Sequence, residues 1–579
     1  MVDSPQGPRP ARTPAGAFIS GAKGRLLPAS IPLRFFGAAV VYHLLAWIAL
    51  AAAAVPWSGF GGGLGWPLAA LHLITLGVLG MSVLGAGAQL LPVATRQAAL
   101  GPRLLAATWW LYTPGVALLA LGIGLARPAL LGAGAVAVSL ALAFWGALTA
   151  RNLYRARGMP GVVGHGWAAL AALLVLLGSA LSLVGFWLGL PGPPRESMLV
   201  LHLVFAPYGF IGMLSLGLSY VLIPMFVLSD TPDDRHQLGS LALAATALLL
   251  AALAASGIAS GLMAAAIAAG AGAVALHLWL MWQALRSGMR RLSGPSWVLV
   301  RLGWAGLVAG LALALALVAN APVPRLGLWF GLCLIGVWQL SFLLGILQRI
   351  APFLAAMHGA TGRRARTPSA LTHDGALRLH LVCHCTALGL LALAIATDSQ
   401  SATLAGAIVG GAGGLAFGVF YLVLLRRMRT PEPLAAAAMG RTGSGREIHE
   451  RERVVRTTRL IPMLMVGALL AAGCKTVRYE MRPPPSDAGR LCVTQCAGIR
   501  EDCRGNEIRR ARLEVDSCER RAEQALRACH GGAEGNKDKL RECERRKPGC
   551  WSHENAIRCD DDHRTCFSQC GGSVVKIVE

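Results

Sequence analysis

The sequence has few charged residues and lacks the cysteine patterns that bind metals or haem. Charged residues make up 14% of the 579-residue chain, whereas hydrophobic residues make up 55% and the mean hydropathy is +0.56. This balance excludes a soluble globular protein and predicts a membrane protein. There is no Cys-x-x-Cys pair and no Cys-x-x-Cys-His sequence, which excludes paired-cysteine metal sites of the usual spacing and covalent attachment of haem.

Acidic residues are scarce, with 29 against 53 basic residues and a net charge of +24. Most of the basic residues of the first 473 positions lie outside the apolar runs, so they indicate membrane orientation and not nucleic-acid binding. If the N-terminus is cytoplasmic, fifteen arginines of the loops and tail fall on the cytoplasmic side and only Arg127, Arg195 and Arg325 on the other. The positive-inside rule then predicts a bacterial inner-membrane protein with both ends of the membrane domain in the cytoplasm.

Twelve apolar runs are long enough to cross about 30 Å of hydrocarbon. They predict spans at residues 33–55, 66–93, 103–126, 129–150, 166–188, 197–228, 237–257, 259–285, 297–320, 326–354, 376–397 and 402–425. We therefore expect an all-α polytopic membrane domain over residues 33–429, preceded by a cytoplasmic tail at residues 1–32.

Three segments of this domain are versions of one another: GMSVLGAGAQLLPV (80–93), GMLSLGLSYVLIPM (212–225) and LSFLLGILQRIAPF (340–353). Each has a glycine seven residues before a proline, and these glycines are Gly85, Gly217 and Gly345. Each copy lies in the second span of a group of four. The pattern predicts three pseudo-symmetric four-helix repeats, over about residues 33–155, 166–291 and 297–429.

The chain changes character after Arg429. A basic polar linker (430–459) leads to the apolar run LIPMLMVGALLAAG (460–473), which is short for a membrane span. Together they are typical of a signal peptide, and LAAG followed by Cys474 resembles a bacterial lipobox with lipidation at that cysteine. The alternative is a short anchor that happens to end in a cysteine. Residues 474–579 are then a lipoprotein that is periplasmic, or in the outer membrane given Lys475, and that arises by cleavage, by fusion or from a joined reading frame.

Ten further cysteines follow the proposed lipid site, and an even, dense set in an exported segment predicts disulfides. They are Cys492, Cys496, Cys503, Cys518, Cys529, Cys543, Cys550, Cys559, Cys566 and Cys570. The first three and the last three have helical spacings that mirror each other. This predicts a small helical domain in which two antiparallel helices are joined by Cys492–Cys570, Cys496–Cys566 and Cys503–Cys559. The other four cysteines would close an inner helix pair.

Ionisable residues inside a membrane are functional candidates because the bilayer makes them costly. His72 and His202 lie at similar depths in the second spans of the first two groups, and neutral imidazole binds haem iron and copper. They form the main candidate cofactor or metal site. A weaker metal set, toward the cytoplasm, consists of His43, His277, His380 and His384. The alternative is that each histidine only hydrogen-bonds a neighbouring helix, and we expect His380 and His384 to be solvated near the interface.

Three segments resemble helices of the haem-copper oxidase subunit I superfamily. HLITLGVLGMSVLGAGAQLLPV resembles its second helix, HLVFAPYGFIGMLSLGLSYVLIPMF its sixth and GILQRIAPFLAAMH its tenth. Over roughly residues 30–430 the chain is similar to this superfamily, and more closely to its NnrS-like bacterial members. The resemblance implies that His72 is a haem ligand, that His202 is a copper or haem ligand, and that partners include respiratory subunits or cytochromes.

The chain also departs from true oxidases. The spans 237–257 and 326–354 contain no histidine, and His202 lacks the proline, acid and tyrosine that follow the oxidases' copper ligand. These departures argue against oxygen reduction and against an enzyme. We expect a protein that serves respiration, nitric-oxide homeostasis or metal homeostasis. The alternatives are a transporter or channel with the histidines along its path, and a scaffold for the exported domain.

Overall fold

The computed structural model describes residues 25–53, 62–259, 261–358, 367–429, 477–482, 484–531 and 556–578. The chain forms two compact units, Met1–Ala438 and Met439–Glu579. The predicted N-terminal tail (all but its last residues), the linker, the signal-like run and Cys474 lie outside the described residues. So do Cys543 and Cys550.

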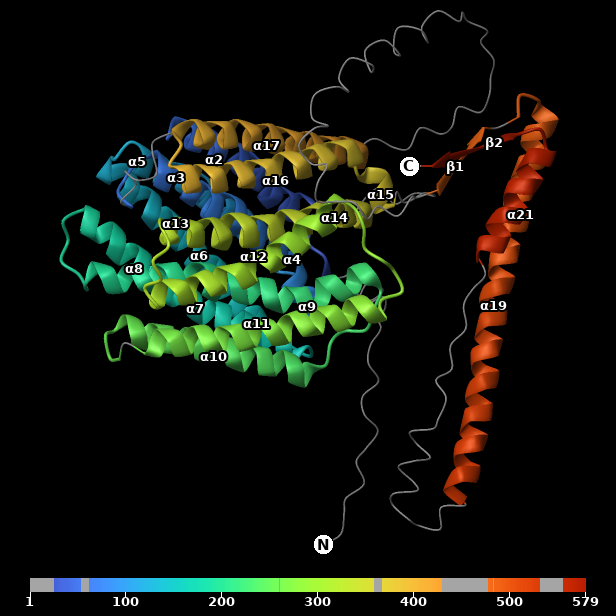
Figure 1. Cartoon of the computed structure of the whole chain (residues 1–579), viewed down its shortest axis with the longest axis horizontal. Coiled ribbons are helices and arrows are strands. Elements are labelled where there is room, and N and C mark those ends of the chain that lie inside the picture. The colour runs from blue at the N-terminus through green and yellow to red at the C-terminus, as the bar shows by residue number, and fades with distance from the viewer. Residues whose placement is uncertain are drawn as a thin grey trace, which may run out of the picture. The chain divides into compact units, whose positions relative to one another are not determined.

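The described part of the first unit contains twelve helices that are long and apolar enough to cross a membrane, which confirms the predicted number of spans. They lie side by side in a bundle (Figure 1). Nine are single helices: α2 (Ser30–Ala52), α5 (Pro102–Gly124), α6 (Pro128–Tyr154), α7 (Pro160–Trp187), α10 (Asp234–Ala255), α11 (Leu262–Ser287), α12 (Pro295–Val318), α16 (Asp374–Thr397) and α17 (Gln400–Arg429). A one-turn helix, α15 (Pro368–Leu371), precedes α16.

The other three spans each contain a π-helical segment between two α-helical parts. The first consists of α3 (Trp66–His72), η3 (Leu73–Gly80) and α4 (Met81–Ala94). The second consists of α8 (Arg195–Val204), η4 (Phe205–Gly212) and α9 (Met213–Val227). The third consists of α13 (Leu326–Gly331), η5 (Leu332–Leu340) and α14 (Ser341–His358). Segments of π-helix are rare, occur mostly as short insertions in α-helices, and are frequent at functional sites.

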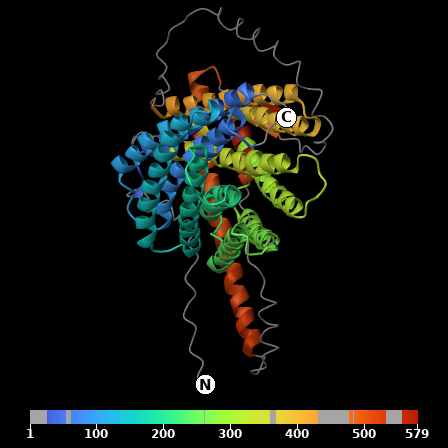
Figure 2. The same cartoon turned by 90° about the vertical axis from the view of Figure 1, so that its left-hand side faces the viewer.

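Small residues allow the helices to pack closely. A Cβ atom added to Gly134 would lie 2.2 Å from the backbone nitrogen of Leu119, and one added to Gly122 would lie 2.2 Å from that of Leu131. The backbones of α5 and α6 are therefore in direct contact, as glycine-rich membrane helices permit. The first and last spans also pack together, because α2 contacts α17. In both views α16 and α17 lie on one side of the bundle and α10 and α11 on the other (Figures 1 and 2).

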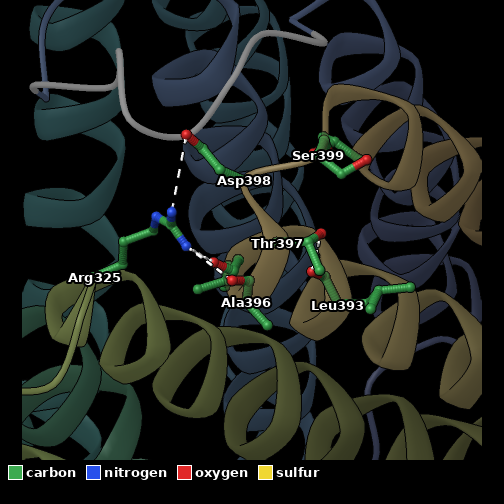
Figure 3. Close-up of polar contacts among 8 residues, drawn as sticks. Arg325, Leu393, Ala396, Thr397, Asp398 and Ser399 are labelled. Carbon is green, nitrogen blue, oxygen red and sulfur yellow. Dashed lines mark hydrogen bonds and ion pairs between the residues drawn. The ribbon is translucent and has the colours of Figure 1, made fainter.

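One arginine links two loops at the same end of the bundle. The guanidinium of Arg325, just before α13, donates to the carbonyl oxygens of Ile395 and Ala396 at the end of α16. It also lies 4.0 Å from a carboxylate oxygen of Asp398 (Figure 3). Helix C-termini leave carbonyl groups without partners, so this arginine caps α16 from another part of the chain.

The second unit contains a long helix, α19 (Asp487–Gly531), a shorter one, α21 (Ala556–Gln569), and the strands β1 (Val477–Arg482) and β2 (Ser573–Val578). The strands pair antiparallel, with Val477 opposite Val578. The sequence predicts a purely helical domain here and does not predict these strands. Three disulfides join α19 to the second helix and its C-terminal end: Cys492–Cys570, Cys496–Cys566 and Cys503–Cys559. These are the three predicted pairs. Cys518 and Cys529 are disulfide-bonded as well.

Candidate functional site: buried histidines of the membrane unit

The structure brings His72 and His202 together. His72 is the last residue of α3, directly before η3, and His202 lies in α8, three residues before η4. Their ring centres are 6.3 Å apart and their ring planes are inclined by only 25°. Both side chains are half-buried. The two residues, 130 positions apart in the chain, thus face each other across the interface of two spans.

The hydrogen bonds of this pair suit a metal site. Nδ1 of His72 lies 2.9 Å from the carbonyl oxygen of Leu68, and because a carbonyl only accepts, this nitrogen carries the proton and Nε2 holds the lone pair. Fixing one ring nitrogen through a carbonyl is the usual support for a ligating histidine. Nδ1 of His202 is buried and has no partner. With metal–nitrogen bonds of about 2.0–2.1 Å, two imidazoles that bind one metal ion from opposite sides have their ring centres about 6 Å apart, and the distance between these two rings is compatible with that.

His43, His380 and His384 form a second group, here called the three-histidine cluster. His43 comes from α2 and the other two come from α16. All three are at most 1% exposed, so the expectation that His380 and His384 are solvated is wrong. Their burial has a tertiary cause, because α17 packs against α16, side chains of α14 hydrogen-bond both rings, and the ring of Phe417 lies 5.0 Å from that of His380.

His277 does not join this cluster. On α11 it packs beside Tyr220, with ring centres 5.2 Å apart, and the ring of that tyrosine also lies 5.4 Å from that of His165 of α7. His165 is fully buried and is missing from the predicted sites, because it lies one residue before the predicted span 166–188. Hydropathy gives no signal for it. In the structure it packs against Gly217, where a Cβ atom would lie 2.7 Å from the Cβ of His165.

The free thiols near the three-histidine cluster take no part in it. Cys383 is partly exposed and Cys385 is exposed, and both are unpaired. In the second unit, the sulfurs of Cys492, Cys496 and Cys570 are also close to one another. These three sulfurs are held in disulfides, so they offer no thiolate to a metal.

Comparison of the sequence with models of known protein families and with curated proteins gave no match.

Proposed function

We propose that the membrane unit is a metalloprotein similar to haem-copper oxidase subunit I and to NnrS-like proteins. In it, His72 and His202 bind haem iron or copper. The observation that carries this proposal is the pair of facing imidazoles, with His72 fixed by Leu68 and His202 left with a buried, unpartnered nitrogen. Haem or copper bound there supplies one-electron chemistry or a site for a diatomic gas. A role in respiration, nitric-oxide homeostasis or metal homeostasis follows from that chemistry.

The proposal includes three four-helix repeats in the membrane unit. Each π-helical segment ends five residues before one of Gly85, Gly217 and Gly345. A Cβ atom on these glycines would lie 2.8 Å or less from an atom of α2, α7 and α12 respectively, the first helix of each group. The third and fourth helices of each group also contact each other, as α5 with α6, α10 with α11 and α16 with α17. Matching contacts at matching positions favour a common ancestry for the three groups.

The described helices α10 and α14 do not supply the further buried histidines that an oxygen reductase requires. Helix α10 begins earlier than predicted and so includes His236, but the side chain of this residue is 52% exposed and lies 3.5 Å from Asp233. Helix α14 carries a histidine only at its end, His358, whose ring nitrogens contact the carbonyl oxygens of Leu354 and Leu27. We therefore propose binding or electron transfer at the His72–His202 pair, without oxygen reduction.

Spectra of the purified full-length protein test this proposal. From a haem-replete host we expect a Soret band or bound copper in stoichiometric amount, lost in His72→Ala and in His202→Ala. His236→Ala, which removes an exposed histidine, should keep the cofactor. Size-exclusion chromatography and circular dichroism check that each variant is folded. A folded wild-type protein that binds neither haem nor copper would refute the proposal.

A transport path is the second candidate function, and one observation favours it. A small cavity inside the bundle is lined by Ser215, Ser219 and His277 together with aromatic and aliphatic side chains. Nδ1 of His277 is buried and has no partner. Nε2 of His165, whose ring contacts the same Tyr220 as His277, is buried without a partner as well. Polar groups around a cavity in a membrane protein can bind a passing solute. Substrate uptake into proteoliposomes that is lost in His277→Ala but kept in His72→Ala would support this function.

For the second unit we propose a lipoprotein in the periplasm or outer membrane, separated from the membrane unit by cleavage before Cys474. Arg426, Arg427 and Arg429 in the last turn of α17 support a cytoplasmic position for that end, and export of the second unit then needs a further signal. Residues 474–579 have a mass of about 12 kDa, a size common for small domains. An immunoblot against this segment that shows only the full-length chain would contradict cleavage.

A further inference from the structure

We propose that the three-histidine cluster is a second metal centre and that it binds monovalent copper. One ring nitrogen from each of His43, His380 and His384 lies within 4.8 Å of the ring nitrogens of the other two. Ligands at about 2.0–2.1 Å from a single ion lie about 3.3–3.5 Å from one another, so small side-chain rotations close the site. This proposal does not depend on a cofactor at His72 and His202.

Each imidazole of the cluster has one nitrogen held by a neighbouring side chain and one without a partner. The unpartnered atoms are Nδ1 of His43, Nε2 of His380 and Nδ1 of His384. A buried polar atom left without a hydrogen bond costs about 1–3 kcal/mol. Three such atoms in one cluster are not explained by helix packing, in which polar side chains are expected to bond across the interface. A shared cation would provide the missing partner for His380 and His384, whose unpartnered nitrogens can hold a lone pair.

The proton of Ser341 identifies the ligand nitrogen of His384. The Ser341 hydroxyl lies 3.1 Å from the carbonyl oxygen of Gly336 and 2.8 Å from Nε2 of His384. The hydroxyl has a single proton, and the carbonyl can only accept it. Nε2 of His384 then donates to the Ser341 oxygen, and Nδ1 keeps the lone pair that a metal requires.

Gln348 holds His380 in a similar way. An amide nitrogen of Gln348 lies 3.1 Å from Nδ1 of His380, while the amide oxygen is buried and has no partner. Turning the amide over places its oxygen against Nδ1, which then donates. Nε2 of His380 becomes the lone-pair nitrogen. In this arrangement both histidines of α16 are oriented by oxygen atoms of α14, which is the support typical of ligating histidines.

His43 differs from the other two because its neighbour competes with the metal. The indole nitrogen of Trp47 donates to Nε2 of His43 over 3.1 Å, so this nitrogen holds the lone pair. Binding of a metal through His43 therefore replaces the Trp47 hydrogen bond. Since a hydrogen bond contributes a net 0.5–1.5 kcal/mol, Trp47→Phe is expected to tighten metal binding by about two- to tenfold.

The charge of the surroundings favours a monovalent ion. Across α2, α14, α16 and α17 the only acidic residue is Asp374, in the first turn of α16, and His384 lies ten residues further along the same helix. A buried divalent cation needs nearby negative charge to offset its loss of hydration. Three neutral imidazoles supply none. Copper is a metal that takes imidazole ligands, and its monovalent form carries the smaller charge into the bundle.

The test uses full-length protein in which His72→Gln and His202→Gln remove the other pair. After incubation with copper(I) and gel filtration we expect one copper per chain, and at least tenfold weaker binding when His43→Gln, His380→Gln or His384→Gln is added. His277→Gln, which removes a buried histidine outside the cluster, should leave the copper content unchanged. X-ray absorption on the loaded background protein should show three imidazole nitrogens around copper and needs no further variant.

Several results would overturn the proposal. The first two are a folded background protein that binds no copper, and copper retained in all three variants. The others are tighter binding of zinc than of copper when the two affinities are measured separately, and sulfur in the first coordination shell. Weaker binding in Trp47→Phe would remove His43 from the ligand set and would overturn it too. If His72→Ala loses the Soret band while copper still binds at the three-histidine cluster, the change is confined to the His72–His202 pair. The proposal for the cluster then stands.

Discussion

The three disulfides of the second unit form a nested ladder, and their contributions to stability can be worked out from the loops that they close. Their sequence separations are 78, 70 and 56 residues. Once the inner disulfide is closed, the middle one adds a loop of only 14 residues and the outer one a loop of 8. The chain-entropy relation then gives about 4 kcal/mol for the inner bond and about 3 and 2.5 kcal/mol for the other two. The bonds at Cys518 and Cys529 shorten the inner loop and make the first value an upper limit.

Loss of one disulfide should therefore cost much less than loss of all three. Replacing both cysteines of a single pair by serine merges two neighbouring loops, which costs about 2–3 kcal/mol for any of the three pairs. Replacing all six removes up to about 10 kcal/mol, as much as the whole stability of a typical small domain. We expect the single-pair variants of residues 474–579 to stay folded and the six-cysteine variant to be unfolded.

Urea unfolding of the segment 474–579, followed by the circular dichroism of α19, measures these differences. Full reduction of the wild-type segment should abolish the helical signal. An unchanged spectrum after full reduction would refute the reasoning. Single-pair variants that differ from one another by more than about 2 kcal/mol would also refute it, because the loop model makes the three costs nearly equal.

Two further predictions concern the membrane unit, and both are measured by thermal unfolding in detergent. Gly134→Ala places a methyl group against the α5 backbone and should destabilise by about 1–3 kcal/mol. Gly178→Ala on α7, where nothing lies within 4 Å, should be neutral or slightly stabilising, and equal melting temperatures for the two variants would contradict the close contact of α5 and α6. Arg325→Gln removes the cap of α16, whose arginine side chain is 30% exposed, and should cost about 1 kcal/mol. No loss relative to Gly178→Ala would show that solvent replaces this cap.

The membrane spans could be predicted because the bilayer constrains length and hydropathy together. Each predicted run corresponds to one helix, with ends displaced by a few residues, as at α10, which begins at Asp234. The three π-helical segments could not be predicted in this way. The hydropathy of a span is the same whether its turns are α-helical or π-helical. Residues such as Thr75 and Gly209, which lie in these segments, do not by themselves indicate a π turn.

The sequence could predict the part of the candidate site whose position depends only on depth in the membrane. His72 and His202 share a depth in similar spans, and the structure places them face to face. The three-histidine cluster depends on side chains from other helices. The burial of His380 follows from Gln348 and Phe417, which lie 32 and 37 positions away in the sequence, so its distance from the predicted end of a span gave the wrong environment.

The π-helical segments connect fold and site. A π turn takes one more residue than an α turn, so the residues before such a segment are rotated relative to those after it. On a regular α-helix the direction of His72 would be fixed by that of Gly85, which packs against α2. Because η3 lies between them, the side of α3 that carries His72 is turned relative to the packing face of α4. The same holds for His202 and Gly217 on either side of η4. The π-helical segments thus allow His72 and His202 to lie close together while Gly85 and Gly217 make matching contacts with α2 and α7.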